Sequence, residues 1–392
     1  MYYLGIDIAK HKHDASIIDD TGKLIAKPIS FPNDVQGGQA LLNWIFQYTD
    51  SPSEILIGME ATGHYWLAIY SFLLKHNFSV IVLNPIQTNA WRKGTEIRKR
   101  KTDKIDATLI ADVIRFGRFM ETPLVNEKMI ALKQLSRFRN SLISNMSDLK
   151  RQAIAVLDQT FPEYHTVFSD IFGTTSSKVL MEYTSPSDYE EVSIDDLTYL
   201  IEICSRKQLG IDTAKQLKEL ASQSFGITFC KDAFSFQLKI LMEQIKFIEE
   251  QVKQCEVKMK QLLIDANSPI TTIPGIGSIL GATILGEIGD IHRFSKPSKL
   301  VAYAGLDASI SQSGQYEATR GSISKRGSSH LRRAIFQAAI TAAWSDPVLK
   351  EFYNKKRSQG KHYLVCIGAV ARKLCYIIYA VLKNNKAYQI PS

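Results

Sequence analysis

Residues 2–10 read YYLGIDIAK, an apolar run that contains a single carboxylate, Asp7. The β-branched and aromatic side chains predict a strand over Tyr2–Ile8. A carboxylate flanked on both sides by apolar residues costs free energy unless it is paired or binds a cation. The first strand therefore predicts both the start of a sheet and a candidate functional acid.

The segments that follow extend this strand into an α/β domain. A second strand near Ala15–Ile18, a turn at DDTG and a third strand near Leu24–Phe31 predict an antiparallel meander. Alternating helices and strands come next: a helix around Ala40–Gln47, the strand EILIGME (54–60), a helix over His64–Lys75, the strand SVIVLN (79–84) and a helix from about Asp103 to Arg118. The order βββαβαβα predicts a mixed sheet with helices on its faces.

Three further carboxylates belong to this domain. Glu60 ends the fourth strand, so a parallel pairing of strands one and four would place Asp7 and Glu60 at one sheet end. Asp103 and Asp106 are spaced i, i+3 and project from one helix face. Four converging acids would repel one another without a divalent cation, and oxygen ligands suit Mg²⁺ or Mn²⁺. Two such ions would stabilise both oxygens of a phosphodiester displacement. The alternative is that Asp103 caps the helix and Asp106 is solvated.

Basic residues surround these aspartates. Between Thr88 and Lys104 there are seven Lys or Arg against two acids: Arg92, Lys93, Arg98, Lys99, Arg100, Lys101 and Lys104. The whole chain has 48 Lys and Arg against 39 Asp and Glu, with a formal charge of +9 and a pI near 9.1. A phosphate backbone needs such counter-charge, so the first expectation is a nucleic-acid partner and the second an anionic membrane surface.

Length and composition indicate a soluble multidomain protein. The 392 residues suggest two or three domains, and 45% hydrophobic with 22% charged residues is typical of globular chains. MYYLGIDIAK lacks the features of a signal peptide, and we expect no membrane span and a cytoplasmic location. The five cysteines are odd in number and form no C-x-x-C pair, so we expect reduced packing residues rather than disulfides or a zinc site.

The middle of the chain is predicted to be helical. A four-three seam indicates a coiled coil: Phe234, Leu238, Leu241, Ile245, Ile248, Val252, Cys255, Met259 and Leu262. An earlier stripe is similar: Leu135, Phe138, Leu142, Met146, Leu149, Ala153 and Val156. The two could pair within one chain or between chains. Residues 160–230 carry an acidic patch and no identifiable chemistry. We predict domains at 1–124, 125–267 and 268–392.

The last region opens on ITTIPGIGSILGATILGEIG (270–289), which resembles a helix-hairpin-helix. Its Gly275-x-Gly277 turn would point backbone amides at a phosphate, although a plain helix turn fits equally well. Serines precede Gly314 in the next loop, at Ser309, Ser311 and Ser313, and cations follow: Arg320, Lys325, Arg326, Arg332 and Arg333. A serine needs a base, a metal or a positive field to attack phosphorus. Composition alone favours a flexible DNA-binding loop with Ser328 or Ser329 as the next helix cap.

Seven motifs resemble one known family, the DEDD transposases of insertion sequences numbered one hundred and ten. They are GIDIAK (5–10), GMEATGHY (58–65), KTDKIDA (101–107), IPGIG (273–277), LVAYAGLDA (300–308), QSG (312–314) and ISKRGSSHLRR (323–333). The resemblance covers about residues 1–120 and 268–385. It implies a RuvC-like, RNase H-type domain with the tetrad Asp7, Glu60, Asp103 and Asp106, and a C-terminal domain with Ser313 as nucleophile.

The resemblance also implies a mechanism and partners. Ser313 would form a phosphoserine link to DNA while tetrad-bound Mg²⁺ polarises the phosphodiester, before strands are exchanged and rejoined. A bridge RNA from the element would pair with donor and target DNA, so base pairing would choose the sequence. Dimers or tetramers would form, with the seam from Phe234 to Leu262 joining subunits.

Three other function classes stay open from the residues. A metal-only RNase H-type nuclease or junction resolvase would use Ser313 for phosphate binding alone. A sugar-kinase or actin-like ATPase would need later glycine-rich nucleotide loops, and we find none convincing. A non-catalytic nucleic-acid-binding protein would tolerate the loss of Asp7.

Overall fold

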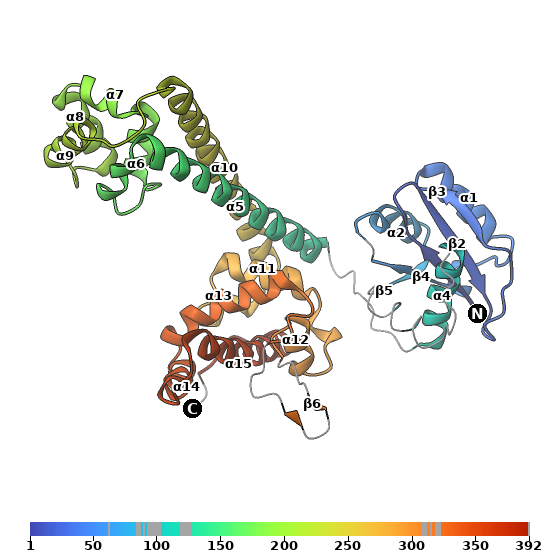
Figure 1. Ribbon diagram of the computed structural model, residues 1–392. Coiled ribbons are helices and arrows are strands. Elements are labelled where there is room, and N and C mark those ends of the chain that lie inside the picture. The colour runs from blue at the N-terminus through green and yellow to red at the C-terminus, as the bar shows by residue number, and fades with distance from the viewer. Residues whose placement is uncertain are drawn as a thin grey trace. The chain divides into compact units, whose positions relative to one another are not determined.

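The computed structural model describes residues 1–61, 63–83, 88, 91, 103–117, 127–307, 312–313, 316–317 and 323–390, with the backbone alone at 103, 312, 313, 316 and 317. The chain folds into two compact units (Figure 1). The first comprises Met1–Ile130 and Ile288–Leu300, and the second comprises Ala131–Glu287 and Val301–Ser392. The three predicted domain boundaries stay predictions.

The first unit is built on a five-stranded mixed sheet with strand order β3-β2-β1-β4-β5. Its strands are β1 (Tyr2–Asp7), β2 (Lys12–Ile18), β3 (Ile29–Pro32), β4 (Ile55–Glu60) and β5 (Ser79–Leu83). The predicted meander is confirmed, because β2 pairs antiparallel with both β1 and β3. β1 pairs parallel with β4, which is the condition for Asp7 and Glu60 to lie at one sheet end. β3 begins only at Ile29, because Pro28 has no backbone N–H to donate to a ladder; Leu24 makes a single isolated bridge to Ile18.

Helices cover both faces of this sheet. On one face α1 (Val35–Ile45) and α2 (Trp66–Lys75) share a core with Leu4, Ile6 and Ile57. On the other face α4 (Asp103–Phe116) packs against β1, β2 and β4. Gly5 permits this contact, since a Cβ there would lie 1.9 Å from the backbone oxygen of Ala107. α4 therefore lies closer to β1 than any side chain larger than hydrogen would allow.

Two long helices dominate the second unit, α5 (Glu127–Thr160) and α10 (Lys231–Asp265). Arg139 pairs with Glu256 and Lys150 with Glu249, so the helices run antiparallel within one chain (Figure 1). Every residue of the predicted α10 seam is buried or half-buried. On α5 the stripe holds except at Phe138, which is 53% exposed. Of the two arrangements that the sequence left open, the structure therefore has the pairing within one chain.

Four shorter helices lie between α5 and α10 in the sequence: α6 (Thr174–Glu182), α7 (Pro186–Glu191), α8 (Ile194–Ser205) and α9 (Ile211–Ser222). They gather around one end of the long pair and share a core with it (Figure 1). Tyr164 and Tyr189 are fully buried in that core. Burial raises the pKa of both Tyr164 and Tyr189 well above the ordinary value, so both stay neutral packing residues.

The C-terminal part of the second unit is helical. It contains α11 (Ser278–Ile288), α13 (Ser329–Ser345), α14 (Pro347–Ser358) and α15 (Tyr363–Asn384), with a short ladder of β6 (Gln312–Ser313) and β7 (Tyr316–Glu317). α12 (Pro297–Tyr303) spans the boundary between the two units at Leu300. α15 is long and apolar enough to cross a membrane by length and composition alone, contrary to the expectation of no such run. It packs against α13 and α14, which is the environment of a core helix. All five cysteines are free, and Cys230 alone among them is exposed.

Candidate catalytic site and nucleic-acid interface

Two of the predicted acids end neighbouring parallel strands. Ile6 of β1 pairs with Met59 of β4, so Asp7 and Glu60 follow in register at the same edge of the sheet. Successive side chains of a strand point to opposite faces, so Asp7 shares a face with Gly5, and Glu60 shares a face with Gly58. α4 covers both glycines. Both carboxylates therefore lie on the α4 side of this edge, as the parallel pairing predicted.

α4 brings the third acid to the same edge. Gly5 approaches Ala107 and Ala111, and Thr108 donates to the Ser16 hydroxyl at 2.8 Å. Arg115, near the C-terminus of α4, donates to the Asp20 carbonyl, which lies at the end of β1 and β2 opposite to Asp7. The helix therefore starts at the Asp7 end of the sheet, where Asp106 is buried with 7% exposure. That burial is inconsistent with the alternative of a solvated Asp106. Asp103 begins α4 one turn earlier, and its side chain lies outside the described residues.

The structure adds two residues that the sequence reasoning missed. Asp14 of β2 pairs directly with Asp7, is 3% exposed, and accepts a 2.5 Å hydrogen bond from the Ser30 hydroxyl. Thr88 is 1% exposed and donates to Glu60 Oε2 at 2.7 Å. A signal for Asp14 was present, since KHDASII carries an acid inside a strand pattern. Nothing local marks Thr88.

The donor chemistry of this edge suits a hard cation. Carboxylates side by side on adjacent strands repel one another, and a bound cation relieves that repulsion. Within the residues whose side chains the structure describes, which exclude Asp103, no three Asp, Glu, His or Cys lie close enough to hold one ion. The acids therefore suit a divalent metal in ligand type, but Asp7, Glu60 and Asp106 do not lie close enough together here to hold one ion.

His13 anchors the turn that follows Asp7. It is 1% exposed, and its Nδ1 accepts the backbone N–H of Ala9 at 3.3 Å. Its ring also meets Phe31 edge to face with 5.4 Å between centroids. Burial lowers the pKa of His13 below its ordinary value, because the charged ring would lose its hydration. A neutral imidazole therefore holds the chain two residues after the first acid.

The predicted basic residues divide into described and undescribed ones. Those that lie outside the described residues are Arg92, Lys93, Arg98, Lys99, Arg100, Lys101 and Arg320. Lys104, Lys325, Arg326 and Arg333 are exposed. Arg332 is half-buried and donates to the Ala304 carbonyl at 3.2 Å, so part of its role is structural.

The two predicted turn glycines differ. Gly275 has φ +89°, and a Cβ there would lie 2.7 Å from backbone atoms of Ala338 and Ala342 on α13, so packing explains it. Gly277 is exposed immediately before α11, with nothing within 4 Å of its Cβ position. Of the pair, Gly277 keeps the open surface that a phosphate would need.

Ser313 lies in β6, whose register pairs it with Tyr316. Its side chain and most of residues 308–322 lie outside the described part of the chain. The ends of this segment are pinned together: the Ser324 N–H donates to the Asp307 carbonyl at 2.8 Å, and the Ser324 hydroxyl bonds the Asp307 carboxylate. The segment that carries Ser313 therefore leaves and re-enters the domain at one point.

An ion pair with a buried carboxylate and an exposed guanidinium joins Glu287 to Arg137. Glu287 is 1% exposed and accepts two hydrogen bonds from Arg137, at 2.6 and 3.0 Å, and one from Ser328 at 2.7 Å. Burial alone would raise the pKa of Glu287, but the bonds from Arg137 and Ser328 lower it below its ordinary value. Ser328 also caps α13 through the Leu331 N–H, as predicted. The pair joins α5, α11 and α13.

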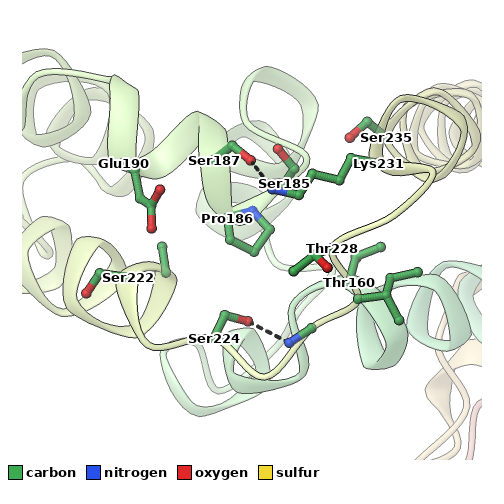
Figure 2. A pocket seen from close by; sticks show the side chains of 13 residues that line it. Thr160, Ser185, Pro186, Ser187, Glu190, Ser222, Ser224, Thr228, Lys231 and Ser235 are labelled. Carbon is green, nitrogen blue, oxygen red and sulfur yellow. Dashed lines mark hydrogen bonds between the residues drawn. The ribbon is translucent and has the colours of Figure 1, made fainter.

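Figure 2 shows a hydroxyl-lined cavity of about 150 Å³ between α7, α9 and the start of α10. Lys231 crosses it to the Ser187 hydroxyl at 3.1 Å, and the Ser224 hydroxyl accepts the N–H of Gly226. These polar groups bond one another. The cavity lies in the acidic segment where the sequence showed no chemistry, and it contains none of the predicted site residues.

Comparison with known proteins finds two family models that match different parts of the chain, and relatives that cover nearly all of it. A family model of IS110-type DEDD enzymes, described as "Transposase", matches residues 4–162, and a model described as "Transposase IS116/IS110/IS902 family" matches residues 267–354. The chain is 27% identical over 387 residues to the pilin gene-inverting protein of Moraxella lacunata, covering 98% of this chain and 97% of that protein. It is 25% identical over 369 residues to the mini-circle putative transposase for IS117 of Streptomyces coelicolor, covering 91% and 88%. The transposase for insertion sequence element IS1111A of Coxiella burnetii is 31% identical over 130 residues, covering 31% and 34%.

Proposed function

Because the chain belongs to the IS110 family of DEDD transposases, we propose that it is an insertion-sequence recombinase that cuts and rejoins DNA under the guidance of a bridge RNA. The observation that carries this proposal is the placement of Asp7, Glu60 and Asp106 at one edge and face of the first sheet. A metal-dependent nuclease needs several carboxylates at one end of its sheet, whereas a plain binding domain needs none.

We assign the first unit to a RuvC-like, RNase H-type domain whose metal ligands are Asp7, Glu60, Asp103 and Asp106. Membership in the family implies a divalent metal requirement, and Mg²⁺ or Mn²⁺ suits these oxygen ligands. When bound, the metal supplies charge stabilisation at the scissile phosphodiester. Glu60 is oriented for that task by the hydrogen bond from Thr88. Lys104, exposed on α4, would contact the DNA backbone.

We assign the nucleophile to Ser313. Its hydroxyl oxygen would bond to a DNA phosphorus while the bond to one deoxyribose oxygen breaks, and rejoining would reverse this exchange with a new strand. The phosphoserine link conserves the phosphodiester, so no external energy source is needed. Lys325, Arg326 and Arg333 supply the positive field that a serine attack on phosphate needs. The contact between Asp307 and Ser324 holds the two ends of the loop together.

The proposed partners are donor DNA, target DNA, a bridge RNA and further copies of the chain, in the cytoplasm of a cell that carries the element. The chain's charge of +9 supports polyanionic partners. The seam from Phe234 to Leu262 was expected to join subunits. α5 covers that seam within one chain, so a dimer or tetramer would need another surface.

The test is a strand-transfer reaction with purified protein, RNA transcribed from the element's flank, donor and target DNA, and Mg²⁺. Wild type is compared with Ser313→Ala and Asp7→Asn, and with Ser309→Ala as a matched control in the same loop. The readout is protein attached to DNA on a denaturing gel. We expect an adduct that requires Ser313, Asp7, the RNA and the metal, and that survives Ser309→Ala.

Two outcomes would redirect the assignment. Cleavage without an adduct, lost in Asp7→Asn but intact in Ser313→Ala, would indicate a metal-only nuclease or Holliday-junction resolvase. An adduct that forms without RNA would support Ser313 as the nucleophile and contradict guidance by a bridge RNA. Each outcome tests one component, because the reactions differ by a single addition or substitution.

A further inference from the structure

The C-terminal domain contains a cavity that none of the roles above uses. Its volume is about 370 Å³, within the range of about 300–1,000 Å³ typical of small-molecule pockets. Helices α13, α14 and α15 line it together with Ile323 and with Lys361 of the α14–α15 connection: Ile323, Phe336, Lys356, Lys361, Leu364, Val365, Cys366, Gly368, Ala369 and Arg372. Leu364 and Val365 are 55% and 57% exposed, so an apolar rim opens to solvent.

The charges around this apolar floor have one sign. Lys356, Lys361 and Arg372 line the cavity, and no acid occurs among its described lining residues. Lys356 and Arg372 are half-buried, which keeps their charge close to the apolar walls. An aromatic wall, Phe336, completes the set. Apolar and aromatic walls beneath a cationic rim match one chemical class, a planar base that carries a phosphate.

Gly368 provides an independent observation. It lies in the second turn of α15, inside the helix, where glycine costs about 0.5–1 kcal/mol of helix stability relative to alanine. Nothing requires that glycine sterically, since the nearest atom to a Cβ there is Phe336 Cε2 at 3.8 Å. The missing side chain leaves open the cavity wall opposite Phe336. The helix thus gives up stability for space at this one position.

The cavity also adjoins the segment that carries Ser313. Arg372 Nε donates to the Leu306 carbonyl at 2.6 Å, immediately before Asp307, where the segment leaves the domain. Ile323 lines the cavity where the segment returns. Both ends of the 308–322 segment therefore contact the cavity residues.

We propose that this cavity binds one unpaired, unstacked nucleotide of the DNA substrate beside the serine segment. The base would stack on Phe336 and fill the space at Gly368, and Lys356, Lys361 and Arg372 would hold its phosphates. A nucleotide that is already unpaired enters such a pocket at the lowest cost. This inference rests on the proposed function for its DNA substrate.

The test uses full-length protein and a DNA duplex with one bulged 2-aminopurine, compared with the same duplex fully paired, without RNA or metal. Wild type should bind the bulged duplex about tenfold more tightly, since one stacked base contributes on that order, with a change in 2-aminopurine fluorescence. Gly368→Leu fills the cavity and should remove the preference. Gly368→Ala should weaken it while raising the melting temperature, and Ala380→Leu, on the exposed side of α15, should leave it intact.

Several results would overturn the proposal: equal wild-type affinity for both duplexes, a preference that survives Gly368→Leu, or a stronger Gly368-dependent preference for a bulged RNA duplex. The Ser313 adduct assay separates this inference from the proposed function. A normal adduct without the bulge preference removes the cavity assignment alone. A bulge preference without any adduct retains the cavity and removes the recombinase chemistry.

Discussion

The acids of the first unit differ in what holds them. Glu60 is oriented by Thr88, Asp14 by Ser30, and Asp106 by its place on a helix against glycine. Each partner comes from a different segment of the chain. Glu60 could be identified because an acid at the end of an apolar strand is conspicuous, and Asp106 by its i, i+3 spacing from Asp103. Asp14 was missed, and so was Thr88, because a hydrogen bond 28 residues away leaves no local pattern.

Asp106→Asn should abolish strand cleavage while leaving the fold unchanged. The amide has nearly the same shape as the carboxylate at this buried site, but it lacks the negative charge that a metal ligand needs. We expect adduct formation to fall at least a hundredfold with an unchanged melting temperature. Asp112→Asn is the matched control on the same helix, where the acid pairs with Arg115. Equal activity of both variants would contradict the assignment.

His13 should make stability depend on pH below its ordinary pKa of about 6.5. Its pKa is lowered in the folded state, so below pH 6.5 the unfolded chain takes up a proton that the folded chain does not. The free energy of unfolding should therefore fall as the pH drops from 7 to 5. Thermal melts of wild type and His13→Gln across that range measure the effect. A wild-type slope identical to that of the variant would show that His13 contributes nothing.

At the scale of elements, the sequence predicted most of the first unit. The antiparallel meander and the mixed sheet with helices on its faces were predicted from the order of helices and strands, and the parallel pairing of β1 with β4 was considered as the condition that brings Asp7 and Glu60 together. The exceptions have physical causes. β3 begins later than predicted because of Pro28. The partner of the α10 seam could not be predicted, since a heptad pattern is the same whether the second helix belongs to the same chain or to another. Ser313 was proposed as the nucleophile from the family resemblance alone, because the composition of its loop favours a DNA-binding role.

Gly5 should be indispensable for the docking of α4. In Gly5→Ala a Cβ would overlap the backbone oxygen of Ala107, and neither backbone can move without separating helix and sheet. We expect the first unit to lose about 3 kcal/mol of unfolding free energy, measured by urea denaturation. Gly277→Ala, where nothing lies within 4 Å, is the control and should change stability by less than about 0.5 kcal/mol. Similar costs for both would contradict the close approach.

At the scale of the whole molecule, charge is unevenly distributed along the chain. Residues 161–230 carry eleven Asp and Glu against five Lys and Arg, a charge of −6, which leaves +15 on the remainder of a +9 chain. A negatively charged segment repels phosphate backbones. We therefore expect nucleic acid to contact the rest of the chain and to avoid α6–α9.

Salt dependence of DNA affinity should report this division. Each phosphate contact that is lost should reduce the slope of log affinity against log salt by about one. We expect this reduction in slope for each of three variants: Lys325→Ala, Arg326→Ala and Arg333→Ala. The slope is measured by fluorescence anisotropy titrations at about 50 to 200 mM salt. Lys178→Ala, an exposed cation of the acidic segment, should leave the slope unchanged. A reduced slope in that variant would place DNA on the acidic segment.

The antiparallel pairing of α5 and α10 places the two ends of the 161–230 segment side by side. Arg139 with Glu256 and Lys150 with Glu249 keep the outgoing and returning helices together, so the chain departs into the 161–230 segment and comes back at adjacent points. Any replacement for that segment must still cover the apolar ends of α5 and α10, because α6–α9 share one core with them. The same position is where an engineer would graft a foreign module.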